Sequence, residues 1–251
     1  MIFSGEVAWV TGSSTGIGRA AALALAREGC RVAVHYNSSE AEAAEVVREA
    51  EALGREAMAV GGDVSEPGEV RRMADEVEEQ FGGVDILVNN AGALVQRTPF
   101  KEITPELWDR VLDVNLKSVL LCSQAVLPTM ERRGGGRIVN VTSVAARNGG
   151  GPGSAAYATA KAGVSNLTRA MAKELLPDGI IVNAVAPGVI TTPFHDRYTP
   201  PEARRKLAGT IPMGREGRPD EVSGAVVFLA SPAAGYVVGE ILEVNGGQLM
   251  D

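Results

Sequence analysis

Two side chains in the second half of the chain have the types and spacing needed for proton transfer. Tyr157 and Lys161 are four residues apart in a stretch expected to be helical, so both should lie on one helix face. A free tyrosine titrates at about 10, too high for efficient acid or base chemistry at neutral pH, and a neighbouring ammonium lowers that pKa. The pair predicts a proton-transfer site, although the same spacing also occurs on solvated helix faces.

Ser143 strengthens this interpretation. It follows a strand-like run at residues 137–142, at the sheet edge where α/β proteins bind ligands. Its hydroxyl could hydrogen-bond an oxygen that gains negative charge, and Thr142 is the alternative for this role. Asn115 lies within a predicted long helix, an unfavourable place for an amide that makes no specific bond. We therefore take Asn115, Ser143, Tyr157 and Lys161 as the candidate catalytic residues, Asn115 being more often structural when considered alone.

A glycine-rich turn near the N-terminus lies between a predicted strand and a predicted helix. Such a turn lets the backbone approach a ligand closely, and the helix N-terminus can direct free N–H groups at a pyrophosphate. The spacing, Gly-x-x-x-Gly-x-Gly, differs from the usual dinucleotide fingerprint, so its position between strand and helix carries the prediction. The residues expected to bind a dinucleotide here are Gly12, Ser14, Thr15, Gly16, Ile17 and Gly18.

The end of the second predicted strand should meet the adenosine ribose. An acidic residue there would hold the ribose hydroxyls and repel a 2′-phosphate, but the chain reads Tyr36-Asn37-Ser38-Ser39. Small polar side chains can donate hydrogen bonds to a phosphate, so we expect NADP(H) to be preferred and NAD(H) to be possible, with Tyr36, Asn37 and Ser38 as contacts. The alternative is that Asn37, Ser38 and Ser39 only cap the following helix.

Short β-branched runs alternate with helical patterns along the whole chain. The predicted strands are 7–11, 31–36, 57–60, 85–89, 137–142, 180–185 and 241–244, and the predicted helices are 16–28, 40–53, 67–81, 105–132, 154–176 and 219–230. This alternation predicts one α/β domain over residues 1–251, a Rossmann fold with a seven-stranded, doubly wound parallel sheet and helices on both faces. The exception is a substrate lid at about 188–217, with one helix around 202–207.

Charge and composition narrow the possible partners. The net charge is −7 and no basic stripe is present, which argues against nucleic acid. Cys30 and Cys122 lie in apolar stretches and His35 and His195 are isolated, so we expect inert thiols and no metal site. With no targeting segment and no apolar run long enough to span a bilayer, we expect a cytoplasmic protein without a membrane partner.

These motifs together resemble the short-chain dehydrogenase/reductase family, and most closely its branch of 3-oxoacyl-[acyl-carrier-protein] reductases. The resemblance covers nearly the whole chain. The matching motifs are Thr11-Gly12-x-x-x-Gly16-x-Gly18, Asp63-Val64, Asn89-Asn90-Ala91-Gly92, Asn115, Ser143, Tyr157-x-x-x-Lys161, Pro187-Gly188 and Val244-Asn245-Gly246-Gly247.

The resemblance implies a role for each matching residue. Tyr157 would exchange a proton with the substrate oxygen, Ser143 would hold that oxygen, Lys161 would lower the pKa of Tyr157 and bind the nicotinamide ribose, and Asn115 would shape a helix distortion that holds a water. The remaining expected cofactor contacts are Asp63, Val64, Asn89, Ala91, Gly92, Pro187, Gly188, Ile190 and Thr192. The family also implies a homotetramer.

Two departures from the family bear on the substrate. Asp178 stands where carrier-protein reductases typically place a basic residue, and the segment 148–153 between Ser143 and Tyr157 is rich in glycine. We expect reversible interconversion of a carbonyl and a secondary alcohol on a small molecule, with a 3-oxoacyl thioester as leading substrate. A sugar or polyol is the alternative, because the lid supplies Phe194, His195, Asp196, Arg197 and Tyr198, although such side chains are often only solvated.

A function of a different class is also open. The fold could serve a nicotinamide-sensing protein that binds the cofactor without chemistry. Such proteins usually lose catalytic groups, whereas Ser143, Tyr157 and Lys161 are all present here, so we favour an enzyme.

Overall fold

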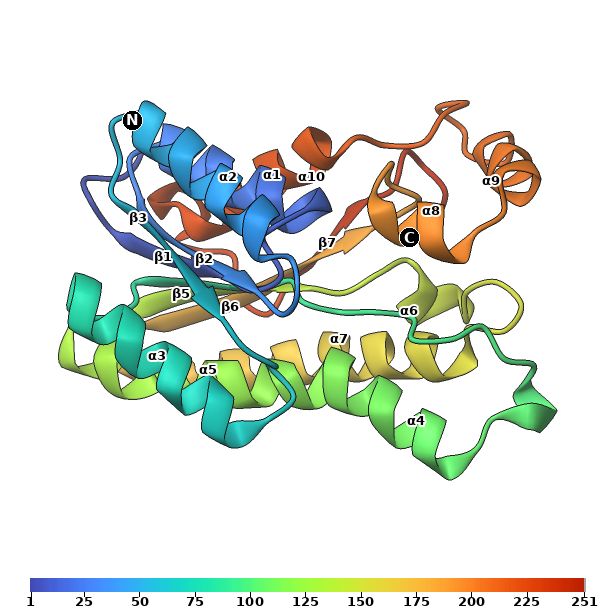
Figure 1. Ribbon diagram of the computed structural model, residues 1–251, viewed down its shortest axis with the longest axis horizontal. Helices are drawn as coiled ribbons and strands as arrows, with labels where there is room; N and C mark the ends of the chain where they lie inside the picture. Colours follow the sequence, from blue (N-terminus) through green and yellow to red (C-terminus); the bar gives the residue numbers. More distant parts are fainter. Residues whose placement is uncertain (251) are drawn as a thin grey trace.

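A seven-stranded parallel sheet lies between two layers of helices in the computed structural model, which describes residues 1–250 (Figure 1). The strand order is β3-β2-β1-β4-β5-β6-β7. The strands are β1 (Val7–Val10), β2 (Arg31–Tyr36), β3 (Ala57–Gly61), β4 (Ile86–Asn89), β5 (Gly136–Val141), β6 (Ile180–Pro187) and β7 (Ile241–Val244). The order reverses between β1 and β4, which is where doubly wound sheets open a crevice for ligands. The predicted fold class is confirmed.

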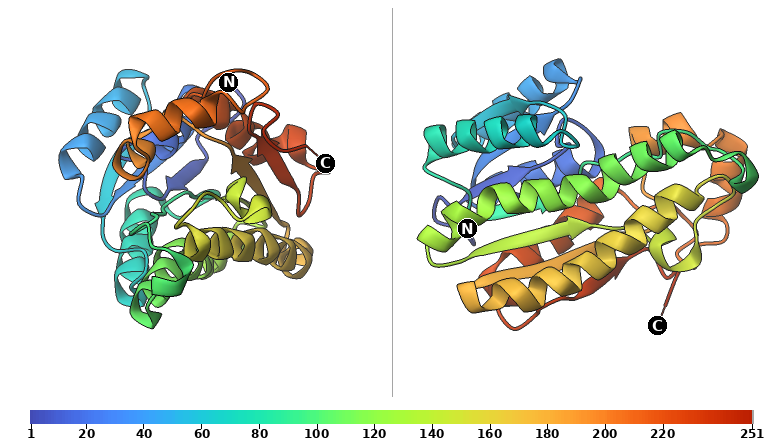
Figure 2. Two further views of the ribbon diagram at one scale, coloured as in Figure 1. Left: turned by 90° about the vertical axis from the view of Figure 1, so that its right-hand side faces the viewer. Right: turned by 90° about the horizontal axis from the view of Figure 1, so that it is seen from below.

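Helices cover both faces of the sheet. One face carries α1 (Gly16–Arg27), α2 (Glu40–Ala52) and α10 (Pro219–Ala230), and the other carries α3 (Pro67–Phe81), α4 (Pro105–Leu112), α5 (Ser118–Arg132) and α7 (Ala155–Leu175) (Figure 1). Seen from below, the continuous α4–α5 path and α7 run along the same face (Figure 2). The short elements are η1 (Phe100–Glu102), η2 (Asp113–Lys117), α6 (Ala145–Asn148), η3 (Leu176–Asp178), α8 (Pro193–Tyr198), α9 (Pro201–Ala208) and η4 (Pro232–Ala234).

Strand β1 is apolar throughout because both of its faces are covered. Its Ala8 and Val10 pack into the core beneath α1 and α10, while Val7 and Trp9 pack into the core against α3 and α5. Successive side chains of a strand point to opposite faces, so a strand covered on both sides is mostly apolar, and the buried asparagines of the neighbouring strands β4 and β5 are hydrogen-bonded to each other. These two cores fix the sheet whose carboxyl edge carries the candidate site.

The helix predicted over 105–132 is divided by one wide π-helical turn, η2. Asn115 lies in this turn, and its Nδ2 donates to the main-chain oxygen of Val111 at 2.9 Å. A side-chain amide that occupies a helical carbonyl competes with the regular backbone ladder, and single π turns are often found at functional sites. The whole path Pro105–Arg132 is long and apolar enough to cross a membrane by length and composition alone. In the structure its segments contact α3 and α7, as a core helix does.

The segment from 188 to 217 contains two short helices, of which the sequence predicted only α9. Both begin with a proline in the first turn, Pro193 and Pro201, a position where the missing N–H has no helical partner anyway. The two ends of the segment meet, because Thr191 N–H donates to Gly217 O and Gly217 N–H donates to Val189 O, each at 2.9 Å. The segment is therefore a loop closed at its base, and α8 and α9 lie beyond the carboxyl ends of the strands (Figure 1).

Candidate active site

A cavity of about 500 Å³ runs along the carboxyl edge of the sheet, from the glycine turn after β1 to α8. Most of the residues predicted to bind cofactor or substrate line it. They are Gly12, Ser14, Thr15, Gly16, Ile17, Asn37, Ser38, Asp63, Val64, Ala91, Gly92, Ser143, Tyr157, Lys161, Pro187, Gly188, Ile190 and Thr192. The carboxyl ends of β1 to β6 and the helix α7 thus bring these distant segments to one place.

Four predicted residues, Gly18, Tyr36, Asn89 and Asn115, lie behind the cavity wall. Gly18 packs beneath the glycine turn, where a Cβ would overlap the carbonyl oxygen of Gly12. The ring of Tyr36 covers Gly61, and Asn89 Nδ2 donates to Asn140 Oδ1 at 2.9 Å. In the structure these residues support the lining and do not form it.

The glycine turn has the shape that a pyrophosphate requires. Gly12 and Gly16 have φ angles of 62° and 58°, in the left-handed region that favours glycine. Helix α1 begins at Gly16, and no side chain caps its first N–H groups. Free amides at a helix N-terminus, together with its positive dipole end, attract an anion, so this end of the cavity fits a dinucleotide phosphate.

Tyr157 and Ser143 bring two hydroxyl groups together at the other end. Ser143 comes from the loop after β5 and Tyr157 from α7; both line the cavity, and the Ser143 side chain is close enough to lower the pKa of Tyr157. Thr142, the alternative to Ser143, donates its hydroxyl to the main-chain oxygen of Lys161 at 2.8 Å. Because that hydroxyl is already used to fasten α7 to β5, Ser143 is the better placed of the two for a substrate oxygen.

Lys161 lies next to Tyr157, but the pKa of Tyr157 is raised in the structure and not lowered as expected. Burial raises the pKa of Tyr157 to about 12, opposed by the hydrogen bond with Ser143. Burial also lowers the pKa of Lys161 to about 8. The Lys161 Nζ lies 5.9 Å from the centre of the Tyr157 ring and donates to the main-chain oxygen of Val141 at 2.7 Å. Tyr157 is therefore protonated at neutral pH, the form that can give a proton to a carbonyl oxygen.

Asn115 holds the loop after β4 in place. Its Oδ1 accepts from Ala93 N–H at 3.1 Å, and its Nδ2 donates to Ala93 O at 2.7 Å. A Cβ on Gly92 would lie 2.7 Å from Asn115 Oδ1 and 3.3 Å from Lys161 Nζ, so the loop passes too close for any larger residue. The helix distortion implied by the family resemblance is present. The side chain of Asn115 within it holds the loop after β4, which lines the cavity.

Arg110 and Asp63 form an ion pair in the lining of the cavity, and the sequence analysis did not identify Arg110 as a site residue. Arg110 Nη2 lies 3.1 Å from Asp63 Oδ2, and Arg110 lines the cavity. Burial would raise the pKa of Asp63, but hydrogen bonds from Ser65 and Arg110 outweigh it and hold the pKa below its usual value. Arg110 belongs to α4, distant in sequence from Asp63, so only the fold reveals the pair.

Near Tyr157 the cavity has an aromatic wall made by α8, within the segment 188–217 that the sequence predicts to be a lid. The Phe194 ring lies 5.6 Å from the ring of Tyr157 and 5.1 Å from that of Tyr198. His195, Arg197 and Tyr198 also line the cavity, whereas Asp196 does not. Val95, opposite in the loop after β4, has a φ of 63°, a strained conformation for a β-branched residue.

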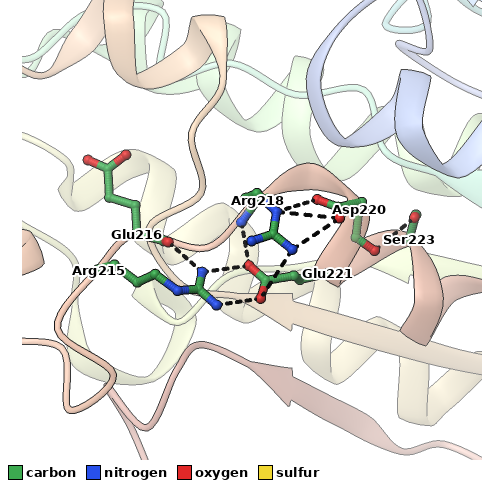
Figure 3. Close-up of polar contacts among 6 residues, drawn as sticks. All are labelled: Arg215, Glu216, Arg218, Asp220, Glu221 and Ser223. Atoms are coloured by element: carbon green, nitrogen blue, oxygen red, sulfur yellow. Dashed lines mark hydrogen bonds and ion pairs between the residues drawn. The ribbon is translucent and has the colours of Figure 1, made fainter.

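Ion pairs fasten the lid at both of its helices and at its return to α10. Arg204 Nε of α9 lies 2.5 Å from Glu216 Oε1, and Arg204 also pairs with Asp196 of α8. Arg215 bonds the carboxylate of Glu221 at 2.6 and 2.8 Å, which ties the lid to the first turn of α10. Figure 3 shows the Glu216 carboxylate turned away from this second pair, with its main-chain oxygen facing Arg215. The two pairs therefore act at separate points of the lid.

Known proteins resemble this chain over nearly its whole length. Residues 12–248 match the family model described as Enoyl-(Acyl carrier protein) reductase. The 3-oxoacyl-[acyl-carrier-protein] reductase FabG of Staphylococcus aureus is 43% identical over 243 residues, which are 97% of this chain and 98% of that protein. The 3-oxoacyl-[acyl-carrier-protein] reductase of Synechocystis is 44% identical over 246 residues, 98% of this chain and 97% of that protein.

Solved structures agree with the fold over nearly the full length. A putative gluconate dehydrogenase from Agrobacterium tumefaciens superimposes with a TM-score of 0.92 at 38% identity, covering 99% of this chain and 97% of that one. An NADH-dependent reductase described as responsible for alginate metabolism gives a TM-score of 0.90 at 35% identity, covering 99% and 98%.

Proposed function

The chain belongs to the short-chain dehydrogenase/reductase family of nicotinamide-dependent oxidoreductases, and we propose that it reduces the 3-oxo group of an acyl thioester to the 3-hydroxy group with NADPH. The observation that carries the proposal is that Ser143, Tyr157 and the buried Lys161 line one cavity together with the glycine turn after β1. The relatives named 3-oxoacyl reductases support the substrate class.

The residues of the cavity fit a dinucleotide cofactor along its length. Gly12 and Gly16 let the glycine turn pack closely against the loop after β4 and against Thr192, since a Cβ on Gly12 would lie 3.0 Å from the Cα of Ala91 and one on Gly16 would lie 3.3 Å from Thr192 Cγ2. The free amides of this turn would bind the phosphates. Asp63 and Val64 would hold the adenine end, and Pro187, Gly188, Ile190 and Thr192 would hold the nicotinamide end. When bound, the nicotinamide supplies the hydride.

The protein's own groups then manage the charge that develops on the substrate oxygen. Both hydroxyls, of Ser143 and Tyr157, would donate hydrogen bonds to the carbonyl oxygen and orient it. As the carbonyl carbon is reduced, Tyr157 transfers its proton to that oxygen, because burial keeps the phenol protonated until the oxygen becomes basic. The Lys161 ammonium stabilises the phenolate that is left, which offsets part of the cost of forming a charge in a buried place.

The pocket for the adenosine ribose favours a phosphate over a bare ribose. Among the described residues, Asn37, Ser38, Ser39 and Thr15 line this part of the cavity, and none of them is acidic. Because Tyr36 lies outside the lining, Asn37 is the position at which a carboxylate would act. We expect Asn37→Asp to shift the ratio of kcat/KM for NADPH over NADH about tenfold towards NADH by repelling the 2′-phosphate. Tyr36→Asp should change it much less; an unchanged ratio in Asn37→Asp means that the phosphate is bound elsewhere.

A panel assay tests the substrate class. NADPH and NADH oxidation would be followed by absorbance with a 3-oxoacyl thioester, the matching free ketone, a 2-enoyl thioester and sugar or sugar-acid substrates in the oxidative direction. The proposal requires the 3-oxoacyl thioester to give the highest kcat/KM. Reduction of the 2-enoyl thioester alone, or turnover of sugars alone, would overturn it.

A sugar or polyol is the second candidate substrate, and the lid supports it. His195, Arg197 and Tyr198 place polar groups in the cavity opposite Tyr157, and a structural neighbour is named a putative gluconate dehydrogenase. We expect His195→Ala to lower turnover of sugars selectively if this candidate is correct, with thioester turnover as the control.

The family also supports a proposal about the oligomeric state and the cellular location of the protein. We propose a homotetramer located in the cytoplasm, acting on a small molecule. Sedimentation of the purified chain measures the assembly, and a monomer that turns over substrate at the full rate would contradict it.

A further inference from the structure

His35 forms a bridge between the two sides of the cofactor end of the cavity. It is 1% exposed, and its ring lies between the glycine turn after β1 and the end of β3. Gly12 N–H donates to Nδ1 at 2.8 Å, and Nε2 lies 2.9 Å from the main-chain oxygen of Gly62. The His35 backbone also pairs with Ser13, whose N–H donates to His35 O and whose Oγ accepts from His35 N–H.

These partners determine which nitrogen carries the proton. A main-chain N–H can only donate, so Nδ1 must be the acceptor, and a carbonyl oxygen can only accept, so Nε2 must carry hydrogen. Only the neutral imidazole protonated on Nε2 satisfies both bonds. An imidazolium would set the Nδ1 hydrogen against the hydrogen of Gly12.

We propose that His35 is a positioning residue for the nicotinamide cofactor, fixing the Gly12 amide of the glycine turn against the β3 end that leads to Asp63. Both ends of the bridge face the cavity, because Gly12 lines it on one side and Asp63, which follows Gly62, lines it on the other. The cofactor of the proposed function would lie between these two sides, so the inference rests on that function and concerns its affinity for cofactor.

The surroundings of His35 keep its ring neutral at neutral pH. Burial lowers its pKa below the usual value, opposed by the bond to Gly62 and by the carboxylate of Asp63. The other charged groups near the bridge are Arg110, which pairs with Asp63, and the paired Glu69 and Arg72 of α3, which lie beside Gly62. Gly12 and Ser13 carry no titratable side chain. The bridge is therefore intact at neutral pH, and it is lost as the pH falls through the lowered pKa of the ring.

Two variants separate the bridge from simple packing. His35→Asn places its Oδ1 near the position of Nδ1 and can still accept from Gly12 N–H, whereas His35→Leu fills the space without any acceptor. The dissociation constant for NADPH would be measured by fluorescence titration without substrate, together with kcat at saturating NADPH. Circular dichroism would check the folding of each variant.

We expect His35→Leu to raise the dissociation constant for NADPH about tenfold with little change in kcat, and His35→Asn to restore most of the affinity. The wild-type dissociation constant should also rise as the pH is lowered through the pKa of His35, and that rise should be absent in His35→Asn. If His35→Leu does not fold, the comparison of the pH dependence of NADPH affinity between wild type and His35→Asn is sufficient to test the proposal.

Equal affinity in both variants, or the same acid response in wild type and His35→Asn, would overturn the proposal. Failure of the proposed function has a different signature, since it would appear as a wild-type protein that binds no nicotinamide or reduces no carbonyl substrate. Titration of the wild type with NADPH at neutral pH therefore comes first.

Discussion

The two ends of the cavity are built by different means. The cofactor end consists of strand ends and a glycine turn, held by main-chain hydrogen bonds and by buried neutral groups such as His35 and Asn89. The substrate end is closed by α8 and α9, which are held by ion pairs through Arg204 and Glu216. The cofactor end is held mainly by backbone geometry, with the Asp63–Arg110 pair beside it, whereas α8 and α9 are held mainly by side-chain ion pairs.

This difference suggests that one end of the cavity determines cofactor binding and the other determines substrate binding. Backbone bonds inside a packed sheet leave little freedom, which suits a cofactor that must be held in one position. The lid depends instead on a few side-chain pairs. Asp196 is exposed, so its pair with Arg204 is sensitive to salt, whereas the pair of Arg204 with Glu216 is largely buried. Breaking these pairs should leave the packed sheet intact. Changes at the two ends should therefore affect different measured quantities.

The largest effect is expected from Tyr157→Phe, which removes the proton donor and keeps the ring. Turnover should fall by about 10²- to 10⁴-fold because general acid catalysis contributes that much, while the dissociation constant for NADPH stays within twofold, roughly. Tyr236→Phe, at a fully exposed tyrosine, is the matched control. Near-normal turnover in Tyr157→Phe would show that another group supplies the proton.

Gly18→Ala should damage the cofactor end without touching the catalytic groups. The new Cβ would overlap the carbonyl oxygen of Gly12, and overpacking of this kind costs about 1–3 kcal/mol. We expect the dissociation constant for NADPH to rise at least about fivefold and the melting temperature to fall. Gly224→Ala in α10, where a Cβ meets nothing within 4 Å, is the control. Unchanged NADPH affinity would mean that the turn does not hold the phosphates.

The pH dependence should report Lys161. Its pKa is lowered to about 8, so the ammonium is present below that pH and lost above it. The value of kcat/KM for NADPH, which reflects the free enzyme, should fall above about pH 8 by up to about tenfold per pH unit. Lys161→Arg, which stays charged, should show no such fall in its remaining activity. A wild-type kcat/KM for NADPH that does not change with pH around pH 8 would show that the charge of Lys161 is not required.

The smallest effect is expected at the lid. Arg204→Met breaks the pairs with Asp196 and Glu216, and we expect KM for the substrate to rise about fivefold with an unchanged dissociation constant for NADPH. High salt should bring the wild type towards the variant. Arg205→Met, on the same helix and without an ion pair among the described residues, is the control. A change in NADPH affinity instead would show that the two ends of the cavity are coupled.

The sequence predicted features that depend on local patterns, and it did not predict features that depend on contacts between distant residues. The strands and the glycine turn were predictable because period and glycine spacing are local signals, and the catalytic residues because their types and spacing are distinctive. Helix α8 was missed because it is only six residues long and has no repeating apolar face. Arg110 and His35 were missed as site residues because their partners are distant in sequence.

The position of Tyr36 shows a different limit. Side chains alternate along a strand, so the direction of the last residue of β2 decides which one meets the ribose. His35 and Asn37 line the cavity, whereas the Tyr36 ring turns to Gly61. A pattern of residue types does not reveal this parity at a strand end. Of the predicted contacts Tyr36, Asn37 and Ser38, the last two line the cavity and Tyr36 does not.

The most direct test of the central claim follows the hydride. NADPH deuterated at the hydride-donating carbon of the nicotinamide, prepared as each of its two stereoisomers, would be used to reduce a 3-oxoacyl thioester, and the product would be analysed by mass spectrometry and NMR. The account predicts deuterium on the carbinol carbon with one of the two stereoisomers. Deuterium at any other carbon, or a product without label from either stereoisomer, would contradict carbonyl reduction at Ser143 and Tyr157.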